Sequence, residues 1–497
     1  MASETASAKK STNETASTHS GDAPPAGKER RIYLLRDLPP EVVAVAFAKT
    51  SRSPKAFDEI AVELTGESSA QFHEKWVVGY GHASVAEHAV LSIAIENVSR
   101  YATEVIEANR LASYTEKSSR FQVFSLDDFY VPAEVAASPL AGEYRDATRW
   151  MFENYHDIQA KLEVYLKDSG RLPRRENETD RGYAVRVRAY ALDRARFLLP
   201  ISALANVGMT ANARVLEHAI RKMLSHELSE IRGIGETLKE VCREAVPTLV
   251  KYAEYNPYMA ETREALESLA GESPAEGAGD TSPETREETY TRLLEYPEEP
   301  ETVLATAILY PYGGHPYESV RARVEALPEE ERMRIIEEAL KRLDRFDIPI
   351  REMEHLTYTF ECLVDQGAYL DLKRHRMCTQ TVQPPTVRHG YTVPELIDDA
   401  GVRPAYLAGV ERAEACFERF SKDFPNEARY FVLNAHRRRM LWQMNLREVM
   451  HVVKLRSSPG GHYTYRRVAQ QVFHEVARVH PNIARFIQVD LEEASGR

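Results

Sequence analysis

The sequence predicts an α+β protein made of two tandem copies of one domain, each a twisted, mainly antiparallel sheet packed with long helices. Three observations support this prediction. The chain has 497 residues, which is more than one ordinary hydrophobic core holds. Its composition changes at residues 271–288, which are small, acidic and contain two prolines. Similar blocks of sequence occur in the same order on either side of that break.

The first block in each half is a Glu-His pair followed by a strand. Glu87-His88 precedes residues 91–95, and a second Glu-His pair at 354–355 precedes residues 357–361. Both segments alternate with the period of two that a half-buried strand requires, and each leads into a stretch compatible with a helix.

The second block is an arginine that precedes an asparagine by 16 residues. Arg196 and Asn212 show this spacing in the first half, and Arg429 and Asn445 show it in the second. Shared order and spacing favour two homologous domains over two unrelated domains with chance matches.

We therefore expect four parts along the chain. Residues 1–30 are rich in Ser, Thr and Ala without an apolar stretch, which predicts a disordered tail. The first repeat is placed at 31–266, an acidic linker at 267–300 and the second repeat at 301–490.

Charge and cysteine usage limit the possible functions. The formal net charge of −12 argues against a general nucleic-acid coat or a basic membrane-surface protein. No apolar run is long enough to predict a membrane span. Cys242, Cys362, Cys378 and Cys416 show no CxxC pattern, so we expect neither a metal site nor disulfides, and a cytoplasmic location.

Two basic clusters could bind an anion in the second half. Residues 373–376 place three cations and His375 beyond a helical run, where a phosphate site and a solvated helix end are both possible. Residues 429–467 contain nine Lys or Arg and one acid, Glu448, which suggests a phosphate-bearing ligand, a nucleic-acid-facing helix or a solvated surface. One predicted helix in this segment carries Asn445, Arg447, His451 and Arg456.

The first half offers a different polar element. Glu116, Ser118 and Arg120 bring a carboxylate, a hydroxyl and an arginine close together, which suits a nucleotide but is also typical of a capped turn. Upstream, Gly79 and Gly81 flank Tyr80 and would allow a tight turn, and Gly81-His82-Ala83-Ser84 then precedes the Glu-His pair.

Taken together, these motifs resemble the flavin-dependent (FAD-dependent) thymidylate synthase family, whose signature is Arg-His-Arg, a Ser three residues later, and Ser-x-Arg after a short gap. The resemblance covers most of 31–266 and, more faintly, 301–488. In the first half the matching motifs are Gly81-His82-Ala83-Ser84, Glu87-His88, Ser99-Arg100, Ser118-x-Arg120, Arg196, Asn212-Ala213-Arg214 and Glu230-Ile231-Arg232.

The two repeats depart from the family pattern in complementary ways. The first has Ala108-Asn109-Arg110 where the family has Arg-His-Arg. The second keeps Arg374-His375-Arg376 but has Pro384 and Thr386 in place of the Ser and Arg of Ser-x-Arg. The first repeat thus keeps the nucleotide element and the second keeps the flavin motif.

The resemblance implies homotetramers whose sites are shared between subunits, so a duplicated chain would form a homodimer that is a pseudo-tetramer. We hypothesise a composite site in each working position. In it, Ser118 and Arg120 of one repeat would meet four arginines of the other, Arg374, Arg376, Arg429 and Arg456.

The resemblance also implies the chemistry. Such enzymes transfer a methylene from methylenetetrahydrofolate to the uracil of dUMP, and reduced FAD supplies hydride. The expected cofactor is FAD, with methylenetetrahydrofolate and NADPH as co-substrates, and Arg456 would polarise the uracil. The expected nucleotide ligands are Glu116, Ser118, Arg120, Arg196 and Arg429. The expected flavin ligands are His82, Ser84, Arg374, His375, Arg376, Asn445, Arg447 and His451.

Two other functions remain open. Altered residues at Glu104-Val105 and Pro384-Pro385 leave room for another pyrimidine nucleotide such as UMP. A descendant without activity could instead bind RNA, with Arg437-Arg438-Arg439 on the phosphate backbone.

Overall fold

The computed structural model describes residues 31–79, 83–120, 122–272 and 289–492, and it divides into two units, Met1–Leu38 and Pro39–Arg497. The described part of the smaller unit, residues 31–38, contains neither helix nor strand. All the features below belong to the larger unit. Among the described residues, no helix combines the length and apolarity needed to cross a membrane.

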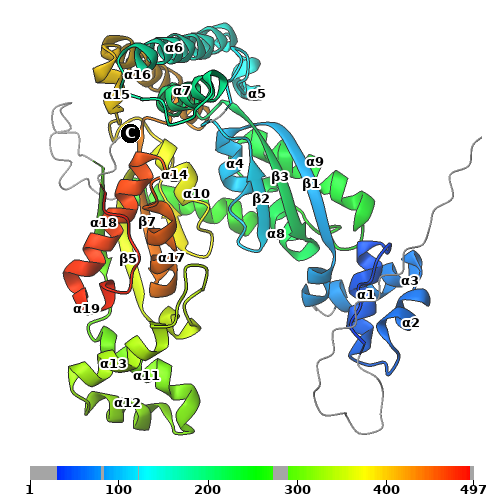
Figure 1. The fold of residues 1–497 in the computed structure, drawn as a ribbon. Coiled ribbons are helices and arrows are strands. Elements are labelled where there is room, and N and C mark those ends of the chain that lie inside the picture. The colour runs from blue at the N-terminus through cyan, green and yellow to red at the C-terminus, as the bar shows by residue number, and fades with distance from the viewer. Residues whose placement is uncertain (1–30, 80–82, 121, 273–288, 493–497) are drawn as a thin grey trace, which may run out of the picture. The chain divides into compact units, whose positions relative to one another are not determined.

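The first repeat is built on an antiparallel sheet of three strands in the order β1-β3-β2 (Figure 1). The strands are β1 (Val90–Ser99), β2 (Ala112–Glu116) and β3 (Leu204–Asn212). Alternate residues of β3 are buried, because side chains of a strand point to opposite faces and only one face packs on the core. The prediction of a strand at 91–95 is confirmed.

The second repeat is built on an antiparallel sheet in the order β4-β5-β7-β6. The strands are β4 (Tyr290–Glu295), β5 (Thr357–Asp365), β6 (Thr379–Val382) and β7 (Arg437–Asn445). The last three reproduce the order of the first sheet, and β7 has the same burial pattern as β3, residue by residue. The predicted duplication and the predicted α+β fold are both confirmed.

The helices that follow corresponding strands also correspond. In the first repeat they are α4 (Arg100–Ile106), α8 (Ala213–Leu224) and α9 (Ser229–Ala245), and in the second α14 (Gln366–Leu372), α17 (Leu446–Arg456) and α18 (Tyr463–Val479). Asn212 and Asn445 cap α8 and α17, each accepting a hydrogen bond from the backbone N–H three residues on. This cap explains why each strand ends in asparagine.

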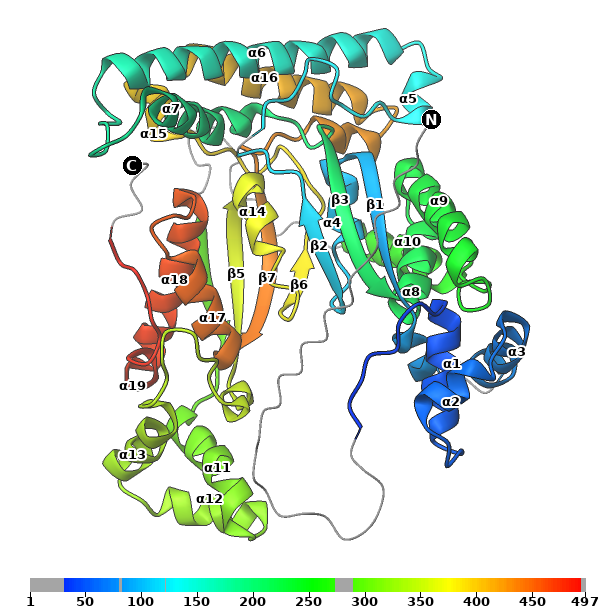
Figure 2. The same cartoon turned by 45° about the vertical axis from the view of Figure 1, so that its right-hand side comes forward.

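The remaining helices extend the two repeats differently. Between β2 and β3 lie α5 (Ala133–Ala136), α6 (Ala141–Asp168) and α7 (Asp180–Ala195), and between β6 and β7 lie α15 (Glu395–Asp399) and α16 (Arg403–Phe420). The helices α6, α7 and α16 lie together beyond one end of both sheets (Figures 1 and 2). The others are α1 (Pro40–Thr50), α2 (Phe57–Val62), α3 (Gly66–Phe72), α10 (Pro257–Glu272), α11 (Pro300–Gly313), α12 (Tyr317–Glu325), α13 (Glu329–Leu340) and α19 (Pro481–Ala484).

A pseudo-two-fold axis relates the repeats. Pro200 and Leu433, which each lie four residues after Arg196 or Arg429, form an antiparallel bridge with one another. The backbone hydrogen bonds beside this bridge come in pairs. In each pair, one bond has its donor in the first repeat and the other has its donor at the corresponding position of the second repeat, as in an isologous dimer interface. The bonds are Ile201 N to Val432 O at 2.8 Å with Asn434 N to Leu199 O at 3.0 Å, and Ser202 N to Tyr430 O at 3.3 Å with Ala435 N to Phe197 O at 2.9 Å.

The larger hydrophobic core is shared by the repeats. It contains Tyr144 and Phe152 of α6 together with Tyr406 and Phe420 of α16 and Phe431 beyond it. A second core lies between the second sheet and α17 to α19. The first repeat therefore completes its core with residues from the second.

Parts of the predicted linker at 267–300 are regular structure. The helix α10 continues to Glu272, and β4 pairs with β5 as an edge strand of the second sheet. Residues 273–288, like the predicted tail at 1–30, lie outside the described residues.

Candidate functional site

The site begins where the two sheets meet along their edge strands β2 and β6 (Figure 2). At the end of β2, the Glu116 side chain is only 1% exposed. Its carboxylate lies 3.3 Å from Arg100 Nη2 and 3.4 Å from Arg374 Nη2 of the other repeat. Burial alone would raise its pKa, but Lys373, Arg100 and Arg374 lower the pKa of Glu116 to about 2. The carboxylate is therefore ionised at neutral pH.

Two corresponding arginines cross the boundary between the repeats in opposite directions. Arg376 Nη2 donates to the carbonyl oxygen of Ala112 at 3.0 Å, and its guanidinium lies over the ring of Tyr114. Arg110 Nη2 donates to Thr379 Oγ1 at 3.2 Å. Arg376, predicted to bind the flavin, is thus held against β2 by the fold itself.

Asp193 joins the arginines of the first repeat. Its carboxylate accepts from Arg120 Nε at 2.9 Å and lies 3.3 Å from Arg196 Nε and 3.4 Å from Arg194 Nη1. His462 Nε2, from the second repeat, lies 3.6 Å away. Burial alone would raise the pKa of Asp193, but His462 and the arginines hold it well below its usual range.

Arg456, expected to polarise the nucleobase, lies on the other side of the same site. Its Nε donates to His375 Nε2 at 2.8 Å, and its Nη2 donates to the carbonyl oxygen of Asp371 at 2.8 Å. The guanidinium lies 5.3 Å from the centre of the Tyr465 ring, whose hydroxyl accepts from Arg120 Nη1 at 3.5 Å. Tyr465 thus connects Arg120 of the first repeat with Arg456 of the second.

Asp371 contributes a central charge. Its carboxylate lies 3.7 Å from Arg456 Nη1. Burial alone would lower the pKa of Arg374, but Asp371 and Glu116 raise it. Asp371 also helps to raise the pKa of Arg120, after Asp193 and Tyr465. One carboxylate therefore acts electrostatically on three arginines that come from both repeats.

We call the connected residues the composite cluster. From the first repeat it contains Glu116, Ser118, Arg120, Asp193 and Arg196, and from the second Asp371, Arg374, His375, Arg456 and Tyr465. Ser118 belongs to it because its hydroxyl accepts from the Arg120 backbone N–H at 3.3 Å. The structure thus brings together most of the predicted nucleotide residues.

Arg429 departs from the hypothesised composite site. Its Nη1 donates to Glu227 Oε1 at 2.8 Å and to the hydroxyl of Tyr101 at 3.4 Å. It is the counterpart of Arg196 across the pseudo-two-fold axis, and Arg196 is the member of this pair that joins the composite cluster. Spacing along the chain relates the two arginines but does not say on which side of the axis each lies.

Four of the predicted flavin residues line two cavities. Asn445, Arg447 and His451 line a cavity of about 760 Å³ beside α17, together with apolar residues such as Met377 and Phe486. Arg447 is oriented there by an ion pair with Glu354 at 2.6 Å. Two segments that are distant in the chain contribute to this lining. Leu343 and Ile348 come from the segment after α13, and Met450 and Lys454 come from α17.

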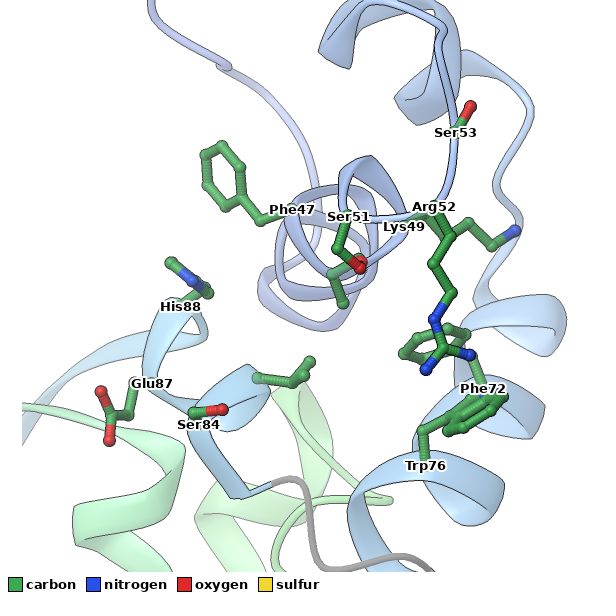
Figure 3. Close-up of a pocket in the computed structure, with 12 residues that line it drawn as sticks. Phe47, Lys49, Ser51, Arg52, Ser53, Phe72, Trp76, Ser84, Glu87 and His88 are labelled. Carbon is green, nitrogen blue, oxygen red and sulfur yellow. The ribbon is translucent and has the colours of Figure 1, made fainter.

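Ser84 lines a different cavity, of about 640 Å³ (Figure 3). Its walls come from residues 47–88 and include Phe47, Phe72 and Trp76, with the guanidinium of Arg52 at 4.5 Å from the Trp76 ring. The linings of the two cavities have no residue in common. His82 lies outside the described residues.

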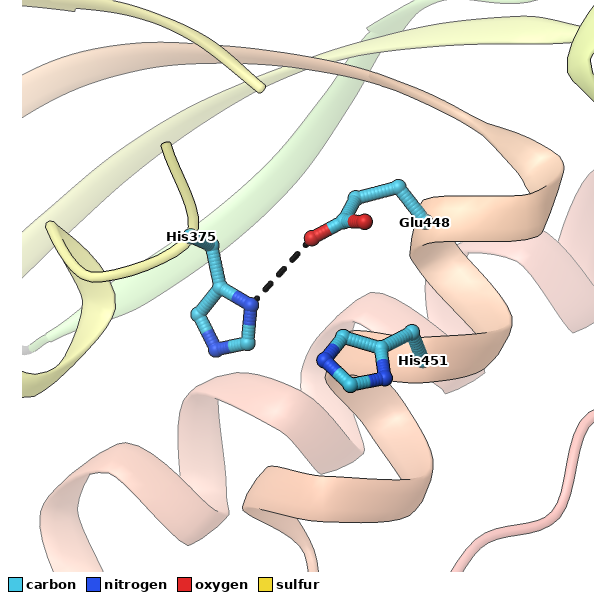
Figure 4. A group of neighbouring side chains, drawn as sticks. All are labelled: His375, Glu448 and His451. Atoms are coloured by element: carbon cyan, nitrogen blue, oxygen red, sulfur yellow. Dashed lines mark hydrogen bonds and ion pairs between the residues drawn. The ribbon is translucent and has the colours of Figure 1, made fainter. Parts of the chain in front are cut away.

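His375, Glu448 and His451 form a group whose ligand atoms lie within 4.8 Å of one another (Figure 4). His375 Nε2 accepts from Arg456, so the proton of the neutral ring sits on Nδ1 and is donated to Glu448 Oε1 at 3.2 Å. Burial also lowers the pKa of His375. A ring with a protonated Nδ1 and an occupied Nε2 has no lone pair for a metal, so the group serves to orient Arg456.

The run Arg437-Arg438-Arg439 is not an open basic surface. Side chains of β7 alternate, which buries Arg438 against Glu104 at 2.6 Å. Arg439 Nη1 donates to the hydroxyl of Tyr290 on the neighbouring strand at 2.7 Å. The RNA-binding alternative loses the feature on which it rested.

Three site residues escaped the sequence analysis, namely Asp193, Asp371 and Tyr465. Two of them carry a local signal, because each aspartate stands three residues before an arginine of the site, Arg196 or Arg374. An arginine cluster at the edge of a core requires carboxylates to offset its charge, so an acidic residue one helical turn before each arginine is the signal that identifies them.

Comparison with known proteins completes this description. The family described as "Thymidylate synthase complementing protein" (Thy1) matches residues 33–248 and 292–482. A protein of Chlamydia muridarum (strain MoPn / Nigg), named UPF0159 protein, is 28% identical over 497 residues, which cover 93% of this chain and 92% of that protein. The flavin-dependent thymidylate synthase of Nitratidesulfovibrio vulgaris is 30% identical over 232 residues, 45% of this chain and 87% of that protein.

Among solved structures, flavin dependent thymidylate synthase ThyX from Helicobacter pylori, complexed with FAD and dUMP, is 16% identical with a TM-score of 0.31 and covers 40% of this chain and 100% of that one. The Thy1 match falls in two regions, one in each repeat, and extends over more than half of the chain. The chain therefore belongs to the Thy1 family of flavin-dependent thymidylate synthases, in an internally duplicated form with a partly degenerate motif in each repeat.

Proposed function

We propose that this chain is an FAD-dependent thymidylate synthase that converts dUMP to dTMP with methylenetetrahydrofolate and NAD(P)H. The observation that supports the proposal most is the composite cluster. In it, Glu116 and Arg120 of the repeat that kept the nucleotide element contact Arg374 and Tyr465 of the repeat that kept the flavin motif. Two incomplete copies together supply one full set of groups.

The phosphate of the nucleotide is proposed to bind Arg120, Arg196 and the Ser118 hydroxyl. Buried Nη2 of Arg196 has no hydrogen-bond partner among the described residues, so it has a donor to offer. Asp193 offsets only one of the positive charges that surround it. A phosphate dianion would neutralise the rest through charge-assisted hydrogen bonds.

Glu116 and Arg456 are proposed to act on the sugar and base. An ionised, buried Glu116 can only accept hydrogen bonds, which suits a ribose hydroxyl or a ring N–H. Arg456 is held from one side by His375 and Asp371, so its guanidinium is oriented before any ligand arrives. Oriented positive charge stabilises the negative charge that develops on the uracil ring during methylene transfer.

The residues around α17 fit the flavin. FAD, when bound, supplies the hydride for the reduction. The cavity of about 760 Å³ combines apolar walls, which suit the flavin ring, with Arg447 and Lys454, which suit its phosphates. The Asn445 side-chain oxygen is used by the helix cap, which leaves its N–H groups for a ligand. Ser84, in the other cavity, is proposed to contact the cofactor from a second chain.

We further propose a cytoplasmic homodimer that forms a pseudo-tetramer of repeats 31–266 and 301–490. Ser84 and Asn445 line cavities without a common residue, which is consistent with a flavin that contacts Ser84 of one chain and Asn445 of another. The twofold pairing of repeats within one chain supports assembly by further twofold pairing.

The test is release of tritium from dUMP labelled at the uracil carbon that accepts the methylene. We expect the purified protein to be yellow and to release tritium when methylenetetrahydrofolate and NADPH are both present, and the Arg456→Lys variant to be at least tenfold slower. Turnover of UMP without turnover of dUMP would show that the substrate is UMP and not dUMP. A colourless protein that refuses added FAD would refute the proposal.

A further inference from the structure

The pseudo-two-fold axis generates a second location equivalent to the composite cluster. We call it the counterpart site and define it by Tyr101, Lys222, Glu227, Arg263 and Arg429. Arg429 occupies in the counterpart site the position that Arg196 occupies in the composite cluster. This correspondence follows because the axis passes between the segments that follow the two arginines. An anion-binding position should therefore exist on both sides of the axis.

The counterpart site already contains an anion, the carboxylate of Glu227. One carboxylate oxygen accepts from Arg429 Nη1 at 2.8 Å, and the other lies 3.1 Å from Arg263 Nη1 and 3.7 Å from His226 Nδ1. Burial alone would raise the pKa of Glu227, but His226, Arg263 and Arg429 lower it. Two further cations lie there. Burial lowers the pKa of Lys222, and Arg232 Nη1 donates to the backbone carbonyl oxygen of Glu227 at 2.7 Å.

The same position in the second repeat carries no side chain. Glu227 lies in the short loop between α8 and α9, and the matching loop between α17 and α18 contains Gly460 and Gly461. Gly460 lies 233 residues after Glu227, as Asn445 does after Asn212, and a Cβ there would meet no atom within 4 Å. A Cβ at Gly461 would lie 2.6 Å from the ring of Tyr465, the residue that connects Arg120 with Arg456. The carboxylate on Arg429 therefore comes from the loop before α9, whereas the carboxylate on Arg196 comes from Asp193 of α7 and the loop before α18 supplies none.

The counterpart site has also lost cations and hydroxyls that the composite cluster keeps. Pro384 and Thr386 stand at the positions of Ser118 and Arg120, and Ala108 stands at the position of Arg374. Arg429 is the arginine that survives there. The Glu227 carboxylate neutralises it, and without that partner a buried Arg429 would be strongly destabilising.

We propose that Glu227 is a built-in anion that closes the counterpart site, so that each chain binds one nucleotide, at the composite cluster. This inference rests on the proposed function for the identity of the nucleotide, but the closure by Glu227 can be tested with inorganic phosphate alone. The duplication has thus left one open site and one site occupied by the protein itself.

The experiment compares thermal unfolding of the FAD-loaded full chain, with and without inorganic phosphate, for the natural protein, Glu227→Gln and Glu254→Gln. The exposed Glu254 pairs with Lys239 of the same repeat, away from Glu227, and serves as the matched control. We expect Glu227→Gln to gain roughly 2–4 °C more from phosphate than the other two proteins, because the freed Arg429 and Arg263 bind the ion. The extra gain should disappear in Glu227→Gln combined with Arg429→Met.

Equal phosphate effects in all three proteins would overturn the closure by Glu227. Calorimetric titration with dUMP provides the second measurement, with one nucleotide per chain expected. Two nucleotides per chain would overturn the inference while supporting the proposed function. No binding of dUMP would contradict the proposed function, and the phosphate comparison would still decide whether Glu227 closes the site.

Discussion

At the scale of single residues, the site depends on carboxylates that hold arginines in place. Asp193 and Asp371 each act on arginines that the sequence analysis had already selected, Arg120 and Arg456 among them. The arginines were predictable because they match a known pattern, but the aspartates were not. Their importance comes from burial and from distances across the two repeats, which a single sequence does not contain.

Asp193→Asn tests this role directly. The substitution keeps the size of the side chain but removes the charge that holds Arg120 at 2.9 Å, so we expect the KM for dUMP to rise at least tenfold while kcat falls less. A structural role alone would lower the amount of folded protein without changing the KM of the folded fraction. Steady-state kinetics at several dUMP concentrations separates the two outcomes.

The lowered pKa of Glu116 predicts that the free energy of unfolding depends on pH in the acid range. Its pKa is about 2 in the folded chain, below the usual value near 4.3, so its contribution is present at neutral pH and is lost as pH falls from about 4 to 2. The contribution is of order 3 kcal/mol. Urea unfolding between pH 6 and 3 should show a shallower loss of stability for Glu116→Gln than for the natural protein, and equal slopes would contradict the prediction.

At the scale of elements, the side chains of a strand alternate between its two faces, and this alternation decides which residues can contact a ligand. The sequence analysis predicted the strands at 91–95 and 357–361 and the helix that contains Arg447 and Arg456, because period and spacing are local properties. It offered Arg437-Arg438-Arg439 only as an alternative contact with an RNA backbone, and β7 turns the middle residue inward, away from such a contact. It also left α6, α7 and α16 without a role, because their packing partners lie far away in the chain.

The buried pair of β7 and α4 offers a prediction at this scale. Arg438 pairs with Glu104 at 2.6 Å, and the corresponding positions across the axis are Ala205 and Leu370, both buried. Arg438→Met alone should cost about 3–5 kcal/mol, because it leaves the buried Glu104 carboxylate without its charged partner, although the neutral amide of Gln366 still donates to it. The double variant Glu104→Leu with Arg438→Ala copies the opposite side and should recover most of that stability in chemical unfolding.

At the scale of the whole molecule, the two repeats form an internal dimer with unequal halves. The match of the family in two regions and the paired hydrogen bonds at Pro200 and Leu433 describe the same symmetry, in sequence and in structure. The sequence predicted the duplication but could not predict which arginine lies on which side of the axis. Only the fold assigns Arg196 to the composite cluster and Arg429 to the counterpart site.

The proposed pairing of two chains gives a prediction for this scale. Light scattering of the FAD-loaded protein should give the mass of two chains, and Ser84→Trp, which fills the cavity of about 640 Å³, should lower flavin affinity without changing that mass. The matched substitution Ser53→Trp at the rim of the same cavity should have a smaller effect. A monomer that binds FAD with full affinity would contradict the proposed assembly.

The shared core also has a consequence for how the protein is made. Residues of the first repeat pack against Tyr406, Phe420 and Phe431, which leave the ribosome long after β1 to β3 have been synthesised. The early part of the nascent chain must therefore wait with apolar surface uncovered, a condition that favours chaperone binding and slow maturation. The presence of both repeats in one chain brings the residues of the composite cluster together, and it also ties the folding of the first half to the arrival of the second.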